Sequence, residues 1–88
     1  MEKVIDIVIA ESSDLLFEGL STILYNSEND YFITRLFSFE DIEKTLLKKK
    51  INLLIVNPLF IYNSIKDVKK IRKQYPHLLI AYINMYAL

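Results

Sequence analysis

The sequence predicts an α/β fold in which a parallel β-sheet is covered by helices on both sides. Apolar runs of strand length alternate along the chain with amphipathic runs of helix length, in the order strand, helix, strand, helix, strand, helix, strand. The run Ile51–Pro58 is almost wholly apolar, which is typical of a strand buried on both faces in a helix-covered parallel sheet. Because right-handed crossovers join such units, we expect three layers, with the sheet in the middle.

The first strand and helix are predicted over the first thirty or so residues. Residues 4–10 are β-branched and mostly apolar, which indicates a second central strand, and Glu11–Asp14 then supply helix-capping groups. A one-sided apolar stripe at helical spacing follows, and it predicts the inward face of a helix that ends in the polar turn 26–30. The stripe consists of Leu15, Leu16, Gly19, Leu20, Ile23 and Leu24. We expect Gly19 to allow close packing of this helix.

An outer strand and a second helix come next. Residues 31–37 alternate enough, with Thr34 and Arg35 interleaved, to predict a partly solvated strand. The segment Ser38–Asp41 resembles a capping box that opens a helix. Its predicted inward face consists of Phe39, Ile42, Leu46 and Leu47. Its last turn carries Lys48–Lys50, which we interpret as a solvated helix end with cations placed favourably against the helix dipole.

The last helix and strand follow the central run. Pro58–Asn63 reads as an apolar loop, and Ser64 can cap a third helix that Pro76 prevents from continuing. The predicted inward residues of this helix are Ile65, Val68, Ile71 and Tyr75, with the lysines and Arg72 facing outward. Residues 78–83 predict the last strand, and His77 before it reads as a turn residue.

Composition limits the class of protein. The 88 residues fit one small domain, 1–88, and show no internal repeat or linker. Eleven basic and eleven acidic residues cancel, so the basic excess expected of a nucleic-acid-binding segment is missing. Zero cysteines exclude disulfides and thiolate metal sites, and no apolar run approaches the length of a membrane span, so we expect a cytoplasmic protein. A hydrophobic content of 52% indicates that something else covers part of the apolar surface.

The residue that leaves the central strand is the candidate for function, because open α/β sheets bind ligands beyond the carboxyl ends of their strands. That residue is Asn57, whose neutral amide is neither a nucleophile nor a metal ligand at ordinary pH. A purely structural reading, in which Asn57 caps the strand end and bonds a loop, stays open. Glu11 reads more readily as a solvated or capping carboxylate than as a metal ligand, and Asp14 as a helix-dipole charge.

The stretch from Ile7 to Leu20 resembles the opening of response-regulator receiver domains of the LuxR/NarL type, and Glu18-Gly19-Leu20 is the most specific part of the match. Residues 53–57 are similar to the strand that ends in the family's phosphoacceptor Asp, 69–76 to its third helix, and 79–86 to its fourth strand. The resemblance implies a three-layer flavodoxin/CheY-like fold with strand order 2-1-3-4. It also implies that the domain is incomplete, lacking the family's last helix, strand and helix and any DNA-binding domain.

The resemblance breaks down at the chemistry. Phosphotransfer in the family uses an Asp nucleophile, an acidic pair that holds Mg²⁺, a hydroxyl that ends the fourth strand and a lysine that ends the fifth. The matching positions are Asn57 as a degenerate phosphoacceptor, Glu11 with Ser12 as a degenerate acidic pocket, and Asn84 as a degenerate switch position. An amide cannot form an acyl phosphate, and Glu11 alone is a poor Mg²⁺ site. We therefore expect no catalytic residue, no metal ion and no cofactor.

These departures predict a pseudo-receiver domain of a two-component, LuxR-family transcription regulator, which acts as a regulatory protein-interaction or dimerisation module rather than an enzyme. The expected partner is a protein: a second copy through the fourth-strand edge, a histidine kinase, or the chain's own effector domain. Nucleic acid, membrane and small-molecule substrates are not expected. Aromatic residues that could form a contact surface are Phe60, Tyr62 and Tyr86. The alternatives are a receiver that takes phosphate at Ser12 or Ser13, a metal-dependent activity beside Glu11, and a solitary structural domain.

Overall fold

Four parallel strands form a single sheet in the computed structural model, which describes residues 4–57 and 65–83, without the side chains of 65–67. The strands are β1 (Val4–Ala10), β2 (Asp30–Leu36), β3 (Leu53–Val56) and β4 (Leu79–Tyr82). Their order in the sheet is β2-β1-β3-β4, and all neighbouring pairs are parallel. The predicted α/β class and strand order are therefore confirmed, and the arrangement is consistent with a flavodoxin/CheY-like fold.

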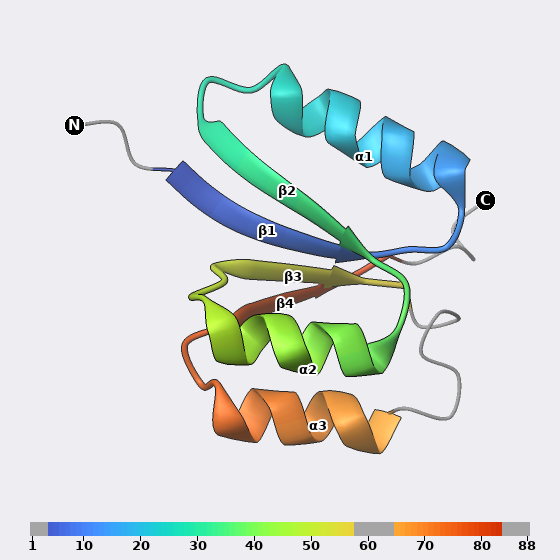
Figure 1. The fold of residues 1–88 in the computed structure, drawn as a ribbon. Coiled ribbons are helices and arrows are strands. Elements are labelled where there is room, and N and C mark those ends of the chain that lie inside the picture. The colour runs from blue at the N-terminus through green and yellow to red at the C-terminus, as the bar shows by residue number, and fades with distance from the viewer. Residues whose placement is uncertain (1–3, 58–64, 84–88) are drawn as a thin grey trace.

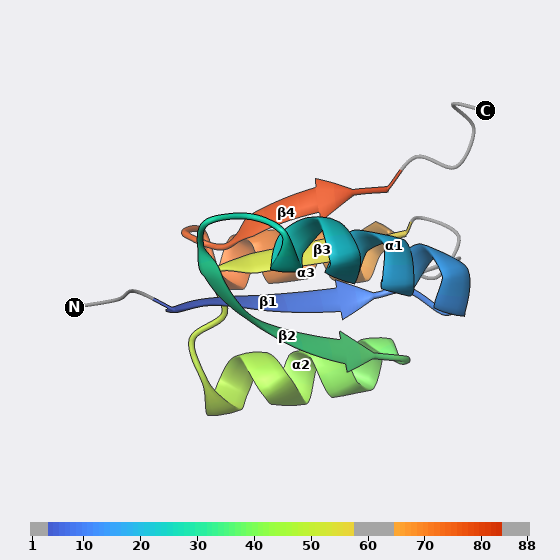
Figure 2. The same ribbon diagram turned by 90° about the horizontal axis from the view of Figure 1, so that it is seen from above.

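Three helices complete the layers. They are α1 (Asp14–Tyr25), α2 (Phe39–Lys48) and α3 (Ile65–Gln74). Helix α1 covers one face of the sheet, and α2 and α3 cover the other (Figure 1). Seen from above, α1 lies over the middle of the sheet, and β2 and β4 form the two edges of the sheet (Figure 2). None of the helices in residues 4–57 and 65–83 is long and apolar enough to cross a membrane.

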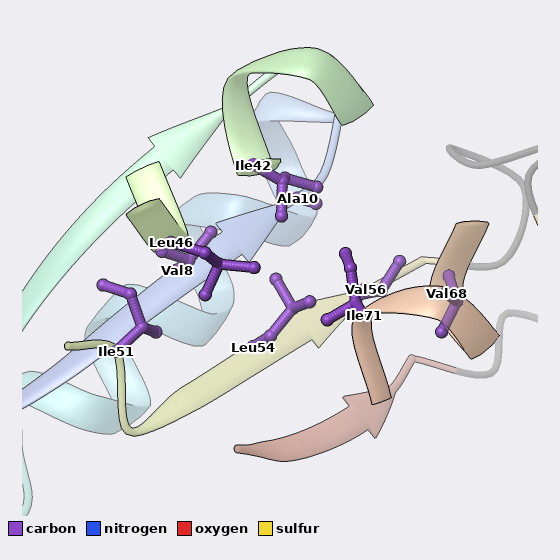
Figure 3. Close-up of a cluster of buried hydrophobic side chains, with 9 residues drawn as sticks. All are labelled: Val8, Ala10, Ile42, Leu46, Ile51, Leu54, Val56, Val68 and Ile71. Atoms are coloured by element: carbon purple, nitrogen blue, oxygen red, sulfur yellow. The ribbon is translucent and has the colours of Figure 1, made fainter. Parts of the chain in front are cut away.

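Each face of the sheet has its own hydrophobic cluster, because successive side chains of a strand point to opposite faces. The larger cluster lies between the sheet and helices α2 and α3 (Figure 3). It consists of Val8, Ala10, Ile42, Leu46, Ile51, Leu54, Val56, Val68 and Ile71. On the α1 side, Ile7, Ile9 and Ile55 pack against partly buried residues of α1 such as Leu20 and Leu24. The central strands are therefore buried on both faces, which explains their continuous apolar sequence.

Serine side chains cap the first turns of two helices, as predicted. The Oγ atom of Ser13 accepts a hydrogen bond from the backbone N–H of Leu16 at 3.4 Å, and that of Ser38 accepts one from Asp41 at 3.1 Å. Each bond satisfies a backbone donor that the first helical turn leaves without a partner. The strands shift slightly from the prediction, because β2 begins at Asp30 and β4 is limited to Leu79–Tyr82.

The predicted inward stripe of α1 is partly wrong. Leu15 and Ile23 are 80% and 70% exposed, whereas Phe17, which the prediction left out, packs against the sheet. A Cβ atom on Gly19 would meet nothing within 4 Å, so this glycine permits no close contact in the described fold. The physical reason is that α1 carries apolar residues around most of its circumference, so their spacing does not select the face that packs.

The second helix also departs from its predicted face at one residue. Ile42 and Leu46 are buried and Phe39 is partly buried, but Leu47 is 80% exposed. Leu47 lies one residue, about 100°, around the helix from Leu46 and so leaves the face that meets the sheet. In α3, Val68 and Ile71 are buried as predicted. Tyr75 lies just after the end of α3 and still packs against the larger cluster.

Several predictions fall on residues outside the described ranges. They concern the loop Pro58–Asn63, the cap Ser64, the switch position Asn84, and the aromatic residues Phe60, Tyr62 and Tyr86. The predicted inward position of Ile65 falls on a side chain that the structure does not describe.

Candidate functional site

The candidate site lies where β1 and β3 end. These two strands are neighbours in the middle of the sheet. After β1 the chain continues to β2 at one edge, and after β3 it continues to β4 at the other edge. Ligands of open α/β sheets bind beyond the strand ends at such a reversal of order. Glu11 follows β1 directly and Asn57 follows β3 directly, so the fold brings these two predicted residues together.

A buried hydrogen bond joins the two side chains. The Nδ2 atom of Asn57 donates to Oε2 of Glu11 at 2.7 Å, and Oε1 of Glu11 accepts from the backbone N–H of Ser13 at 2.9 Å. The backbone N–H of Asn57 donates to the carbonyl of Ala10 at 3.3 Å. Both carboxylate oxygens of Glu11 are therefore bonded within the chain. Buried charges need such donors, because burial removes the water that would otherwise solvate them.

This geometry overturns one part of the prediction for Glu11 and is compatible with the predicted structural role of Asn57. Glu11 is only 1% exposed, so the prediction of a solvated carboxylate is wrong, although its bond to the amide of Ser13 does support the start of α1. Asn57 is 5% exposed, and its side chain bonds across the sheet to Glu11 rather than only to a nearby loop. The pair ties the end of β3 to the end of β1.

Arg35 fixes the turn between β1 and α1. From β2, its Nε donates to the carbonyl of Glu11 at 3.1 Å, and Nη2 donates to the carbonyl of Ser12 at 3.2 Å. Its Nη1 pairs with Oδ1 of Asp14 at 2.7 Å. The guanidinium also lies over the rings of Phe17 and Phe37, 4.7 and 4.5 Å from their centroids. One planar group therefore holds several backbone and side-chain partners at once.

The sequence interpretation treated Arg35 as an ordinary polar residue of an outer strand and missed this role. One signal was available: Arg35 is one of two arginines in a chain whose other basic residues are lysines, and it precedes the predicted end of its strand by two residues. A guanidinium suits this position because its fork of donors can satisfy carbonyls and a carboxylate together. The predicted dipole role of Asp14 is compatible with its place in the first turn of α1, and the ion pair with Arg35 adds to it.

The other predicted site residues stay outside the buried pair. Ser12 is exposed, and its described polar contact runs from its backbone carbonyl to Arg35. Ser13 uses its hydroxyl to cap α1. The acidic pocket predicted from Glu11 and Ser12 therefore contains one carboxylate, and Asn84 lies outside the described residues.

The arrangement favours a fixed structural bridge over chemistry. Within residues 4–57 and 65–83, no group of three or more His, Cys, Asp or Glu side chains could hold a metal ion. Mg²⁺ prefers octahedral oxygen ligands and is usually held by carboxylates together with substrate phosphates. The single carboxylate of Glu11 already accepts two hydrogen bonds, and the facing amide of Asn57 presents a donor to it. A cation at this point would have to displace that donor.

The opposite, amino end of the sheet has a separate group of polar contacts. Lys49 pairs with Asp6 at 3.2 Å, and its Nζ lies 4.3 Å from the ring centroid of Phe32. Lys48, Lys49 and Lys50 are all exposed, as the prediction of a solvated helix end requires, and Lys49 adds an ion pair and a ring contact that the prediction did not include. His77 lies in an exposed turn, as predicted.

No protein-family model, curated protein or solved structure matches this chain. The observed strand order is compatible with the resemblance to receiver domains that the sequence suggested.

Proposed function

We propose that this chain is a receiver-like domain of a LuxR-family transcription regulator that takes no phosphate at Asn57 and acts as a regulatory protein-interaction or dimerisation module. The observation that carries the proposal is the buried hydrogen bond of 2.7 Å from Asn57 to Glu11, at the point of the sheet where a receiver carries out phosphotransfer.

The bond supports the proposal through its charge balance. A phosphorylated site must gather a metal ion and donors around several negative charges. Here one negative charge, on Glu11, is matched by the amide donors of Asn57 and Ser13 without any ion. An amide at position 57 also lacks the nucleophilic oxygen that an acyl phosphate requires. The charge of Glu11 is therefore balanced without a phosphoryl group or an ion, and we place regulation in contacts made elsewhere on the domain.

The edge of β4 is the surface we propose for those contacts, with a second copy as the partner. Among the described strands β4 pairs with β3 alone, so its other side presents backbone N–H and C=O groups. Leu79 and Tyr82 on this strand are both exposed. Unpaired strand edges template the addition of another strand, and exposed apolar side chains add to that tendency.

Sedimentation at tens of micromolar tests this surface. We expect association of the wild-type chain that Tyr82→Arg weakens, because a charge on an edge strand opposes pairing. A wild-type chain that sediments as a clean monomer would contradict the proposed dimerisation. In the coding sequence after Leu88, a helix-turn-helix would support the regulator context, and its absence would favour a solitary domain.

Incubation with acetyl phosphate or phosphoramidate, followed by intact mass measurement, tests the chemistry. We expect no gain of a phosphoryl group by the wild-type chain. The alternative receiver, phosphorylated at Ser12 or Ser13, draws on one observation: Ser12 is exposed at the start of α1, with its carbonyl bonded to the guanidinium of Arg35. A phosphoryl group retained by wild type but lost in Ser12→Ala or Ser13→Ala would establish that alternative instead.

A further inference from the structure

Helix α1 has a second apolar face that the sheet does not cover. Leu15, Gly19 and Ile23 follow one another at spacings of four, which places them in one row along the helix. Leu15 and Ile23 are largely exposed, and a Cβ atom on Gly19 would meet nothing within 4 Å. We call this row the α1 ridge. The helix also carries Glu18 and Asp14, of which Asp14 pairs with Arg35, and no basic residue of its own, so the ridge is an apolar row on an acidic helix.

A groove of about 690 Å³ lies at the amino end of the sheet, between the end of α2 and the turn after α3. We call it the α2–α3 groove. Its apolar lining includes Leu47 and Leu79, both exposed, together with Tyr75. Lys48, Lys50 and His77 also line it and are exposed, and no acidic residue does. The groove therefore combines an apolar lining with a basic edge.

The balanced composition conceals a division of charge along the chain. The first 43 residues hold ten acidic and two basic residues, net −8, while the remaining 45 hold one acidic and nine basic residues, net +8. The α1 ridge belongs to the acidic part and the α2–α3 groove to the basic part. Opposite potentials on two surfaces steer their encounter and set its orientation.

We propose that the α1 ridge of one copy docks into the α2–α3 groove of another. An apolar row meets an apolar lining, the acidic flank meets the basic edge, and Gly19 leaves room for the helix backbone to approach the groove closely. Within one molecule the two surfaces cannot meet, because α1 covers one face of the sheet and α2 and α3 cover the other (Figure 1).

The contact is heterologous, since the two copies use different surfaces. Each copy that docks its ridge retains an open groove, and the copy that receives it retains an open ridge. Repetition then produces rings or open chains rather than a closed two-fold dimer. This geometry differs from pairing through the β4 edge, although Leu79 of β4 also lines the groove, and the ridge contact does not depend on Asn57.

The test uses two variants that each remove one surface. Ile23→Lys places a positive charge on the ridge against the basic groove, and Leu47→Gln removes apolar lining from the groove. Both side chains are exposed, so folding should not change. All proteins carry Tyr82→Arg to suppress the β4 edge. Tyr25→Lys is the matched control, because it adds the same charge at another exposed position of α1, outside the ridge.

Sedimentation should show that each variant alone loses association by a factor of about ten or more, while Tyr25→Lys associates like its parent. A mixture of the ridge and groove variants should form one-to-one dimers, because one supplies an intact groove and the other an intact ridge. High salt should weaken the association. A parent that stays monomeric, or a mixture that stays monomeric while the parent associates, would overturn the proposal.

Discussion

Replacing Asn57 by aspartate tests the central feature of the candidate site. The substitution changes a hydrogen-bond donor into an acceptor that faces Oε2 of Glu11, which lies 2.7 Å from Nδ2 in the wild-type chain. Both positions are almost fully buried. Two carboxylates this close together cannot both stay ionised without a large cost. We therefore expect Asn57→Asp to lower the free energy of unfolding at neutral pH.

Two contributions set the size of the effect. The lost hydrogen bond to a charged group is worth about 1.5–3 kcal/mol. Repulsion between two charges about 4 Å apart adds up to about 4 kcal/mol at an effective dielectric constant of roughly 20, before the side chains relax or take up a proton. A net loss of about 3 kcal/mol would lower Tm by roughly 12–24 °C in a domain of this size. Total stabilities are about 5–15 kcal/mol, so a loss of about 3 kcal/mol would remove a large share of a stability at the lower end of this range.

Urea unfolding followed by circular dichroism measures the change, and a reversed pair provides the control. Combining Glu11→Gln with Asn57→Asp exchanges donor and acceptor, so an amide again donates to a carboxylate, and we expect most of the lost stability to return. Millimolar Mg²⁺ should also raise the Tm of Asn57→Asp and leave that of the wild-type chain unchanged, because a ligand stabilises only the state that it binds. An Asn57→Asp variant as stable as wild type, or a reversed pair no more stable than the single variant, would contradict this role of the buried hydrogen bond.

Three further substitutions test other parts of the fold. Gly19→Ala should raise the free energy of unfolding by about 0.5–1 kcal/mol, because alanine favours the helix and its Cβ meets open space; destabilisation would show a hidden close contact. Ser21→Ala should raise the free energy of unfolding, measured by urea titration, by about 1 kcal/mol, because the buried hydroxyl of Ser21 has no hydrogen-bond partner among the described residues. A lower free energy of unfolding would indicate that the hydroxyl has a partner elsewhere. Arg35→Lys should lower Tm and reduce the free energy of unfolding by about 1–2 kcal/mol, because an ammonium cannot reproduce the two guanidinium donors that bind the carbonyls of Glu11 and Ser12. An unchanged Tm would contradict this role of Arg35.

The strands and helix starts could be predicted because their signals are local. A strand buried on both faces needs a continuous run of apolar residues, and residues 53–56 provide one wherever they sit in the chain. Ser13 and Ser38 cap helices whose first turns begin at the next residue, so each bond spans three positions. The order of the strands followed from the family resemblance alone, whereas the rule for parallel crossovers predicted helices on both faces of the sheet.

Only the tertiary structure could show that Glu11 is buried and hydrogen-bonded to Asn57. Its burial depends on Asn57, which lies 46 residues away in the sequence and reaches it only because β1 and β3 pair. The clamp by Arg35 likewise depends on the pairing of β1 with β2. Hydrogen bonds between such distant residues leave no periodic pattern in the sequence.

The packed face of α1 was also undetermined by its sequence. Apolar side chains occupy more than half of the circumference of α1, so its residues alone favour neither the row with Phe17 and Leu24 nor the row with Leu15 and Ile23. The strands before and after α1 determine how it lies on the sheet, and that contact buries Phe17 and exposes Leu15. A hydrophobic pattern predicts which side chains gain from burial, but the number that can be buried is limited by the area of the neighbouring sheet.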